Sequence, residues 1–390
     1  MQINKPENTL QNISVGSKEV NAARLAFFIP GFAVSTWAPM IPIVKERLNL
    51  EADVLGILLL CIGISAFIVM PFAGILGQKW GCKKVLLITT TLLALDVVFL
   101  SFLPNIISYV LALALFGAAM GSTEVTMNIN SVIVEKLDGR RLMSGMHAFW
   151  SIGCFASAGL FSLLASLGLS VTLIALLHCG IMLAIIAYFG RSWLPYNNPG
   201  GEKAFALPRG IVIIIGTLAC ISFLVEGAVM DWSGVLLTEV KNMDIALAGT
   251  GYAIFSVAML IMRLLGDKTV QFLGEQKAVI GGSFVTAAGF ALVVVLDNLY
   301  LNALAFILIG LGCANIVPVF YSLLKYQKDM PISAAVTSVT SLGYTGVILG
   351  PALLGFVAHG INISAVFELL ALLLIIEAVI AKYVFCKLKI

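Results

Sequence analysis

The residues best suited to chemistry lie on one helical face between positions 117 and 135. Read as a helix, the segment GAAMGSTEVTMNINSVIVE brings its small and polar residues together at steps of three and four. They are Gly117, Gly121, Glu124, Asn128, Ser131 and Glu135. Such a face is typical of a helix that lines a cavity or packs closely in a membrane bundle. A carboxylate in that setting is costly, so Glu124 is a candidate functional residue; the alternative is that it braces two helices.

Composition requires that this helix belong to a membrane protein. Of 390 residues 60% are hydrophobic and only 11% are charged, and the mean hydropathy is +1.06. A soluble core cannot absorb that much apolar surface. Twelve apolar runs have the length of about 20 residues that a bilayer demands. They cover 23–44, 53–76, 84–103, 107–131, 143–167, 170–190, 211–237, 247–265, 277–296, 299–324, 333–358 and 362–385.

The distribution of Lys and Arg predicts the orientation. With the N-terminus inside, only Lys45, Arg47 and Lys241 of the 23 basic residues fall outside. Because basic residues are concentrated in cytoplasmic loops, both termini are expected in the cytoplasm of a cell with an inner membrane. Residues 1–20 have no apolar core segment, so no cleavable signal peptide is expected.

A polar connection, RSWLPYNNPGGEKAFALPRG, divides six runs from six. The halves echo each other at an offset of about 190 residues, as the short GQK and GDK loops illustrate, which is what a duplicated unit leaves behind. We therefore predict an all-α polytopic protein with twelve transmembrane helices in two pseudo-symmetric six-helix bundles. The predicted parts are a tail (1–22), a bundle (23–190), a linker (191–210), a second bundle (211–385) and a tail (386–390).

The loop GILGQKWGCKK resembles the signature of the major facilitator superfamily between spans two and three. Gly74, Lys79, Gly81 and Lys83 match that signature, whereas Gln78 replaces its Asp and Cys82 replaces a basic residue. The second-half copy, RLLGDK, contributes Arg263 and Asp267. The resemblance implies that these loops form a conformational latch on the cytoplasmic side, which the change to Gln78 weakens in the first half.

A narrower resemblance covers EVTMN (124–128), Glu135 and RRLMSGMHAFWSIG (140–153). It is similar to a bacterial branch of the superfamily related to fucose-permease-like sugar–proton symporters. In those symporters the Glu of a Glu-Thr-x-x-Asn-Pro motif is implicated in proton coupling. Glu124 and Asn128 match this pair, and Ile129 stands where the Pro would be. The resemblance implies a transporter without specifying the solute.

The other acids in apolar runs are Asp96, Glu226, Asp231, Glu368 and Glu377. No Lys or Arg is expected near the membrane midplane, and a carboxylate without a cation in a low dielectric resists ionisation. Glu226 and Asp231 are therefore candidate proton-coupling residues beside Glu124, although Asp231 approaches the outer end of its span. Asp96 and Glu377 are expected in interhelical hydrogen bonds or as protonated acids, rather than in direct coupling. Proton coupling is favoured over sodium coupling because no broken-helix sodium site is recognisable.

Further polar and aromatic residues could contact proton or solute. His147 titrates near neutral pH and either exchanges protons with Glu124 or bonds two helices. Asn128 and Asn315 are candidate solute ligands, and the rings of Trp37, Trp150 and Tyr344 are candidate walls against a sugar-like solute or simple packing residues. Pro318 should free the carbonyl group of Ala314 for a kink or a polar contact.

These features favour a monomeric secondary transporter of a small polar organic solute, such as a sugar or related metabolite. Its partners would be the solute, protons and the lipid bilayer, with no nucleic acid, cofactor or metal site. Import and export stay open, including drug or metabolite efflux by proton antiport. An enzyme is disfavoured because Gly-x-Ser-x-Gly, HExxH and nucleotide-binding motifs are missing, and a channel because no filter motif repeats.

Overall fold

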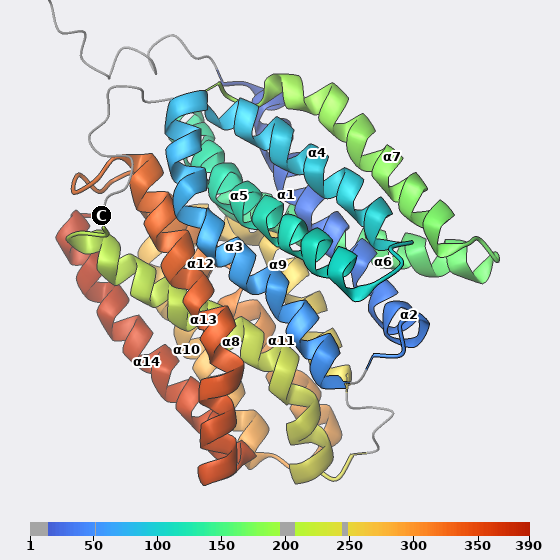
Figure 1. Ribbon diagram of the computed structural model, residues 1–390. Helices are drawn as coiled ribbons and strands as arrows, with labels where there is room; N and C mark the ends of the chain where they lie inside the picture. Colours follow the sequence, from blue (N-terminus) through green and yellow to red (C-terminus); the bar gives the residue numbers. More distant parts are fainter. Residues whose placement is uncertain (1–14, 51, 196–206, 244–248) are drawn as a thin grey trace, which may run out of the picture. The chain divides into compact units, whose positions relative to one another are not determined.

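The computed structural model describes residues 15–50, 52–195, 207–243 and 249–390, and every regular element in those residues is a helix (Figure 1). The long helices in the first half are α1 (Ser17–Trp37), α2 (Met40–Arg47), α3 (Ala52–Trp80), α4 (Cys82–Leu100), α5 (Ile106–Asp138), α6 (Met143–Ser166) and α7 (Val171–Phe189). Those in the second half are α8 (Ile211–Val235), α9 (Thr250–Leu273), α10 (Glu275–Val295), α11 (Leu299–Cys313), α12 (Ile316–Leu323), α13 (Ile332–Gly360) and α14 (Ile363–Leu388). Short helical segments η2 (Gly190–Ser192) and η3 (Leu236–Val240) follow α7 and α8.

Ten helical segments in the described residues are long and apolar enough to cross a membrane. The remaining two predicted runs coincide with α4 and α9, which carry charged residues such as Asp96 and Arg263 within the helix. Two predicted spans are broken. The first divides into α1 and α2 before Pro39, and the tenth divides into α11 and α12 at Ala314 and Asn315.

The chain forms two compact units. Unit 1 contains residues up to Arg140, Met146–Leu207 and Pro331–Thr337, and unit 2 contains Arg141–Gly145, Pro208–Met330 and Ser338–Ile390. The predicted tail 1–22 and linker 191–210 fall partly outside the described residues, at 1–14 and 196–206. The first helix nevertheless begins at Ser17, earlier than the expected start at position 23.

Unit 1 is assembled around α5, which packs against α3, α4 and α1, while α4 also packs against α7 (Figure 1). The glycines of the small-residue face serve this packing. A Cβ added to Gly121 would lie 2.5 Å from the carbonyl oxygen of Ala66 on α3, and one added to Gly117 would collide with Ile62. Glycine is therefore required where the two backbones approach closely.

In unit 2, α10 packs against α11, α14 and α9, and α8 packs against α14 and α9. Close backbone approach recurs between α10 and α11. A Cβ on Gly282 would lie 2.5 Å from the carbonyl oxygen of Gly312, whereas the neighbouring Gly281 has open space around it. The helices α10 and α11 are thus held together by glycine contacts as well as by apolar side chains.

The first residues of the predicted linker are fastened to unit 1. The indole N–H of Trp193 donates to the carbonyl oxygen of Ala22 at 2.8 Å, and the backbone N–H of Leu194 donates to Asn130 Oδ1 at 3.1 Å. Lys83 Nζ donates to the carbonyl oxygen of Arg191 at 2.6 Å. Residues 191–195 are consequently part of the packed bundle.

The two halves differ in where their second and third long helices join. Gly81 turns the chain after α3 with φ 87 and ψ 147, and Gly274 turns it after α9 with φ 83 and ψ 153, backbone angles that favour glycine. Gly81 follows Gln78 by three residues, but Gly274 follows Asp267 by seven. The helix α9 continues to Leu273, beyond the predicted limit of the eighth span at 265. Arg263 therefore lies well inside the helix.

Candidate functional site

Glu124 and Asn128 lie one turn apart on α5, and their side chains come together. Asn128 Nδ2 donates to the carbonyl oxygen of Glu124 at 2.9 Å and lies 3.5 Å from its Oε2. Asn128 is 1% exposed, and its Oδ1 has no hydrogen-bond partner among the described residues. Glu124 is partly exposed. The Asn128 amide therefore lies beside a carboxylate that is not fully buried.

The other first-half candidates have different surroundings. His147 on α6 is partly exposed, and its ring lies 4.9 Å from that of Phe27 on α1. Trp150, also on α6, is partly exposed. Trp37 is only 3% exposed, with its ring 6.3 Å from that of Tyr109. Of the two tryptophans, Trp150 is thus the less buried.

Glu226 is not an isolated carboxylate. Arg263 Nη2 on α9 donates to both Glu226 oxygens on α8, at 3.1 Å each. The side chains of Arg263 and Glu226 are 7% and 18% exposed. The expectation that the buried acids lack a cation is therefore wrong at Glu226. Arg263 is predicted to be part of the latch because it belongs to the RLLGDK copy of the signature loop; in the structure its guanidinium group contacts Glu226.

A second carboxyl group lies close to this ion pair. Glu377 on α14 is 0% exposed, and Ser222 Oγ, one turn before Glu226 on α8, donates to its Oε1 at 2.6 Å. Glu377 Oε2 has no hydrogen-bond partner among the described residues. The Cys313 thiol at the end of α11 interacts electrostatically with Glu226, Arg263 and Glu377. The predicted interhelical hydrogen bond of Glu377 is thus confirmed, and Ser222 is a partner that sequence reasoning missed.

The break between α11 and α12 completes this polar cluster. Arg263 Nε donates to the carbonyl oxygen of Ala314 at 3.3 Å. Pro318, four residues on, has no N–H to occupy that carbonyl group, so the prediction of a freed acceptor at Ala314 is confirmed. Asn315 is 5% exposed, and its Oδ1 has no partner among the described residues. Both Asn128 and Asn315 therefore keep a buried acceptor that protein groups leave unused.

Two further second-half candidates lie outside the cluster. Asp231 is exposed and lies near the end of α8, five residues after Glu226. This agrees with its predicted position near the end of the span. Tyr344 on α13 is partly exposed, with its ring 6.2 Å from that of Phe223.

Asp96 in unit 1 is 2% exposed, and its Oδ2 has no hydrogen-bond partner within the described part of the chain.

The first signature loop makes specific contacts within unit 1. Gln78 is 5% exposed, and its Nε2 donates to Ser333 Oγ at 2.7 Å. A Cβ on Gly74, one turn earlier, would collide with the Thr337 side chain. Gln78 thus substitutes an uncharged hydrogen bond for the carboxylate of the signature. Lys79 at the end of α3 is exposed.

The second signature loop contacts the start of α6 within unit 2. The backbone N–H of Gly145 donates to Asp267 Oδ1 at 2.9 Å. A Cβ on Gly266 would lie 2.5 Å from Ser144 Cβ. A carboxylate that accepts from an N–H in the first turn of a helix is favoured by the helix dipole as well as by the hydrogen bond. Asp267 therefore holds α9 to α6, while Arg263, one turn away, holds α9 to α8.

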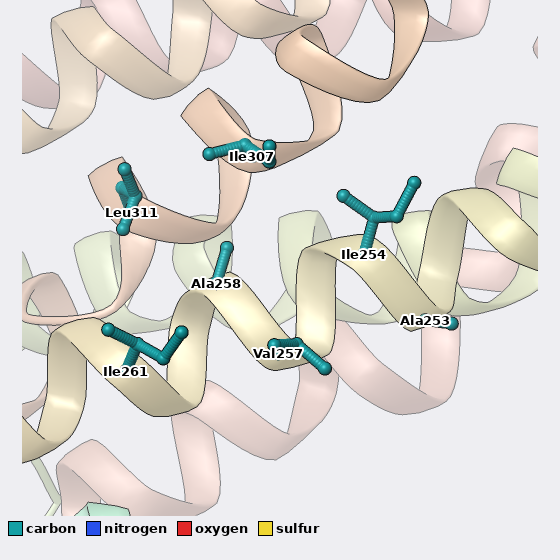
Figure 2. Close-up of a pocket in the computed structure, with 7 residues that line it drawn as sticks. All are labelled: Ala253, Ile254, Val257, Ala258, Ile261, Ile307 and Leu311. Atoms are coloured by element: carbon teal, nitrogen blue, oxygen red, sulfur yellow. The ribbon is translucent and has the colours of Figure 1, made fainter. Parts of the chain in front are cut away.

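A hollow of about 430 Å³ between α9 and α11 has a different character (Figure 2). All of its lining side chains are aliphatic: Ala253, Ile254, Val257, Ala258, Ile261, Ile307 and Leu311. A polar solute needs hydrogen-bonding groups to replace those of water. This hollow is consequently unsuited to such a solute.

Many apolar helices with a few buried charged groups define a polytopic membrane protein, and comparisons with known proteins identify its family. The model of the major facilitator superfamily matches residues 25–344. An uncharacterized MFS-type transporter of Yersinia pestis is 39% identical over 375 residues, which are 96% of this chain and 98% of that protein. The chain therefore belongs to the major facilitator superfamily.

Solved structures share the fold at low sequence identity. The human organic anion transporter MFSD10 has a TM-score of 0.73 at 14% identity, over 93% of this chain and 99% of that one. The E. coli fucose:proton symporter FucP also has a TM-score of 0.73, at 15% identity, over 94% of this chain and 98% of that one. The resemblance to fucose-permease-like transporters is thus matched at the level of the fold.

Proposed function

We propose that this transporter moves a small polar organic solute, such as a sugar or related metabolite, and that a proton gradient drives the transport. Twelve spans in two halves would rock around a central site, exposing it to each side of an inner membrane in turn, with both termini in the cytoplasm. The observation that carries the proposal is the pairing of Glu124 with Asn128 on the polar face of α5.

Glu124 is the proposed proton carrier. A partly exposed carboxylate in a membrane helix can accept a proton from one side and lose it when the site turns to the other. Asn128 donates to it and keeps Oδ1 for a solute hydroxyl or amine. His147 is proposed as a proton partner because its imidazole is partly exposed. Trp150 and Tyr344, whose rings are partly exposed, are proposed as solute contacts. Asn315 is a further proposed contact because its Oδ1 has no hydrogen-bond partner among the described residues. FucP, a fucose:proton symporter, gives the chemical precedent.

The test begins with a thermal-shift screen of purified protein against sugars, organic acids and amines. A stabilising compound is then followed in reconstituted vesicles under an imposed pH gradient. We expect wild-type protein to accumulate it uphill and Glu124→Gln to lose accumulation while keeping counterflow exchange, because exchange does not require net proton movement. Glu368→Gln, at an exposed position on α14, is the matched control.

Uphill accumulation by Glu124→Gln at the wild-type level would remove Glu124 from the mechanism. Solute flux that ignores both the pH gradient and a protonophore would remove proton coupling altogether. Vesicles sorted by orientation assign the direction of transport, which decides between uptake and export by proton antiport.

A further inference from the structure

The cluster around Glu377 contains more negative than positive groups. Two carboxyl groups, Glu226 and Glu377, interact electrostatically with each other. Within the described residues, Arg263 is the guanidinium group that contacts this cluster, and both of its Nη2 contacts are to Glu226. Burying an ionised carboxylate without a cation costs far more free energy than burying a neutral acid. The neutral form of Glu377 is therefore the one that fits its site.

The hydrogen bonds of Glu377 agree with this assignment. Its Oε1 accepts from the Ser222 hydroxyl group at 2.6 Å, and its Oε2 has no partner among the described residues. Buried carboxylates normally have both oxygens hydrogen-bonded. A single donor to a fully buried carboxyl group is more compatible with a proton on Oε2 than with a charge shared by both oxygens.

The helices packed against α14 supply few other ionisable groups. The described part of α8 carries Glu226, Asp231 and Cys220, and η3 carries Glu239. The only ionisable groups of α10 are Glu275 and Lys277, both in its first turn. Cys313 at the end of α11 also interacts with Glu377. Of these groups, Glu226 is the one whose charge acts on Glu377, and that charge is balanced only while Arg263 contacts it.

We propose that Glu377 is a second proton-binding site, in the second half of the transporter, whose proton is held or released according to the state of the Glu226–Arg263 pair. The proposal rests on the proton coupling proposed above. While the pair is closed, Arg263 neutralises Glu226, and Glu377 can release its proton more readily. When α8 and α9 separate, the bare charge of Glu226 favours the protonated form of Glu377. Release leaves one negative charge on Glu377 and transfers one proton to solvent, and uptake reverses this.

Infrared difference spectroscopy of purified protein in nanodiscs, recorded across a pH step, tests the protonation directly. We expect a band of a protonated carboxyl group that is lost in Glu377→Gln and retained in Glu368→Gln and Glu124→Gln. Glutamine can still accept from Ser222, which favours folding of the variant. Ser222→Ala is the second probe: it removes the hydrogen bond to Oε1 and should shift the frequency of the same band without abolishing it.

A carboxyl band unchanged by both Glu377→Gln and Ser222→Ala would overturn the inference. So would normal uphill accumulation by Glu377→Gln, since the proton would then take no part in transport. The spectroscopic result is separable from the primary proposal. If Glu124→Gln transports normally but the band depends on Glu377, the role of Glu124 fails and that of Glu377 stands. If Glu124→Gln loses uphill accumulation but the band does not depend on Glu377, the role of Glu377 fails and that of Glu124 stands.

Discussion

At the scale of the residue, Arg263 changes the interpretation of the second half. Sequence alone places it in a cytoplasmic latch, whereas the structure directs its guanidinium group to Glu226 and to the carbonyl oxygen of Ala314. Its Nη2 contacts both carboxylate oxygens while its Nε reaches a third acceptor, which a lysine ammonium group on a flexible stem could not reproduce with the same geometry.

Replacement of Arg263 should therefore be costly. Removing one partner of a buried ion pair leaves the other charge uncompensated, so Arg263→Ala should destabilise the protein by about 3 kcal/mol or more. The thermal midpoint in detergent measures this, with the exposed Arg209→Ala as control. Combining Arg263→Ala with Glu226→Gln should recover part of the loss, because no bare carboxylate remains. An equal loss in the single and double variants would contradict this account.

At the scale of the element, α9 connects two sets of contacts. Asp267 joins it to the first turn of α6, and Arg263, one turn away on the same helix, joins it to α8. A rigid helix transmits a displacement at one position to the next turn, so movement at Asp267 would reach the Glu226–Arg263 pair.

The glycines of α10 provide a matched test of close helix packing. Gly282→Ala would force a Cβ to 2.5 Å from the carbonyl oxygen of Gly312, whereas a Cβ at Gly281 meets nothing within 4 Å. Overpacking of this kind costs about 1–3 kcal/mol, while alanine itself favours the helix by up to about 1 kcal/mol. We expect a lower thermal midpoint for Gly282→Ala and an unchanged or higher one for Gly281→Ala. Equal midpoints would show that α10 and α11 can separate at no cost.

At the scale of the whole molecule, the topology follows from the spans and the basic residues. Twelve predicted spans would put both termini on one side, and the Lys and Arg distribution predicts that this side is the cytoplasm. Cys386, exposed near the C-terminus, is a natural probe of the cytoplasmic side. Ser166, exposed at the end of α6, lies on the predicted outer side.

Labelling with a membrane-impermeant maleimide checks this topology. In intact cells with a permeable outer envelope, Ser166→Cys should react and wild-type protein should not; after permeabilisation of the inner membrane, both should react. Cys386→Ser should remove the wild-type signal. Labelling of Cys386 in intact cells would invert the predicted orientation.

The sequence by itself determined the features that depend on local pattern. Apolar run length identified the helices, helical spacing brought Glu124 and Asn128 to one face, and the missing N–H of Pro318 freed Ala314. Only the tertiary structure decided the contacts of Glu226 and Glu377, because their partners are 37 and 155 residues away. Such pairs depend on where α9 ends and which faces of α8 and α14 oppose each other. Side-chain packing sets both, and no local pattern records it.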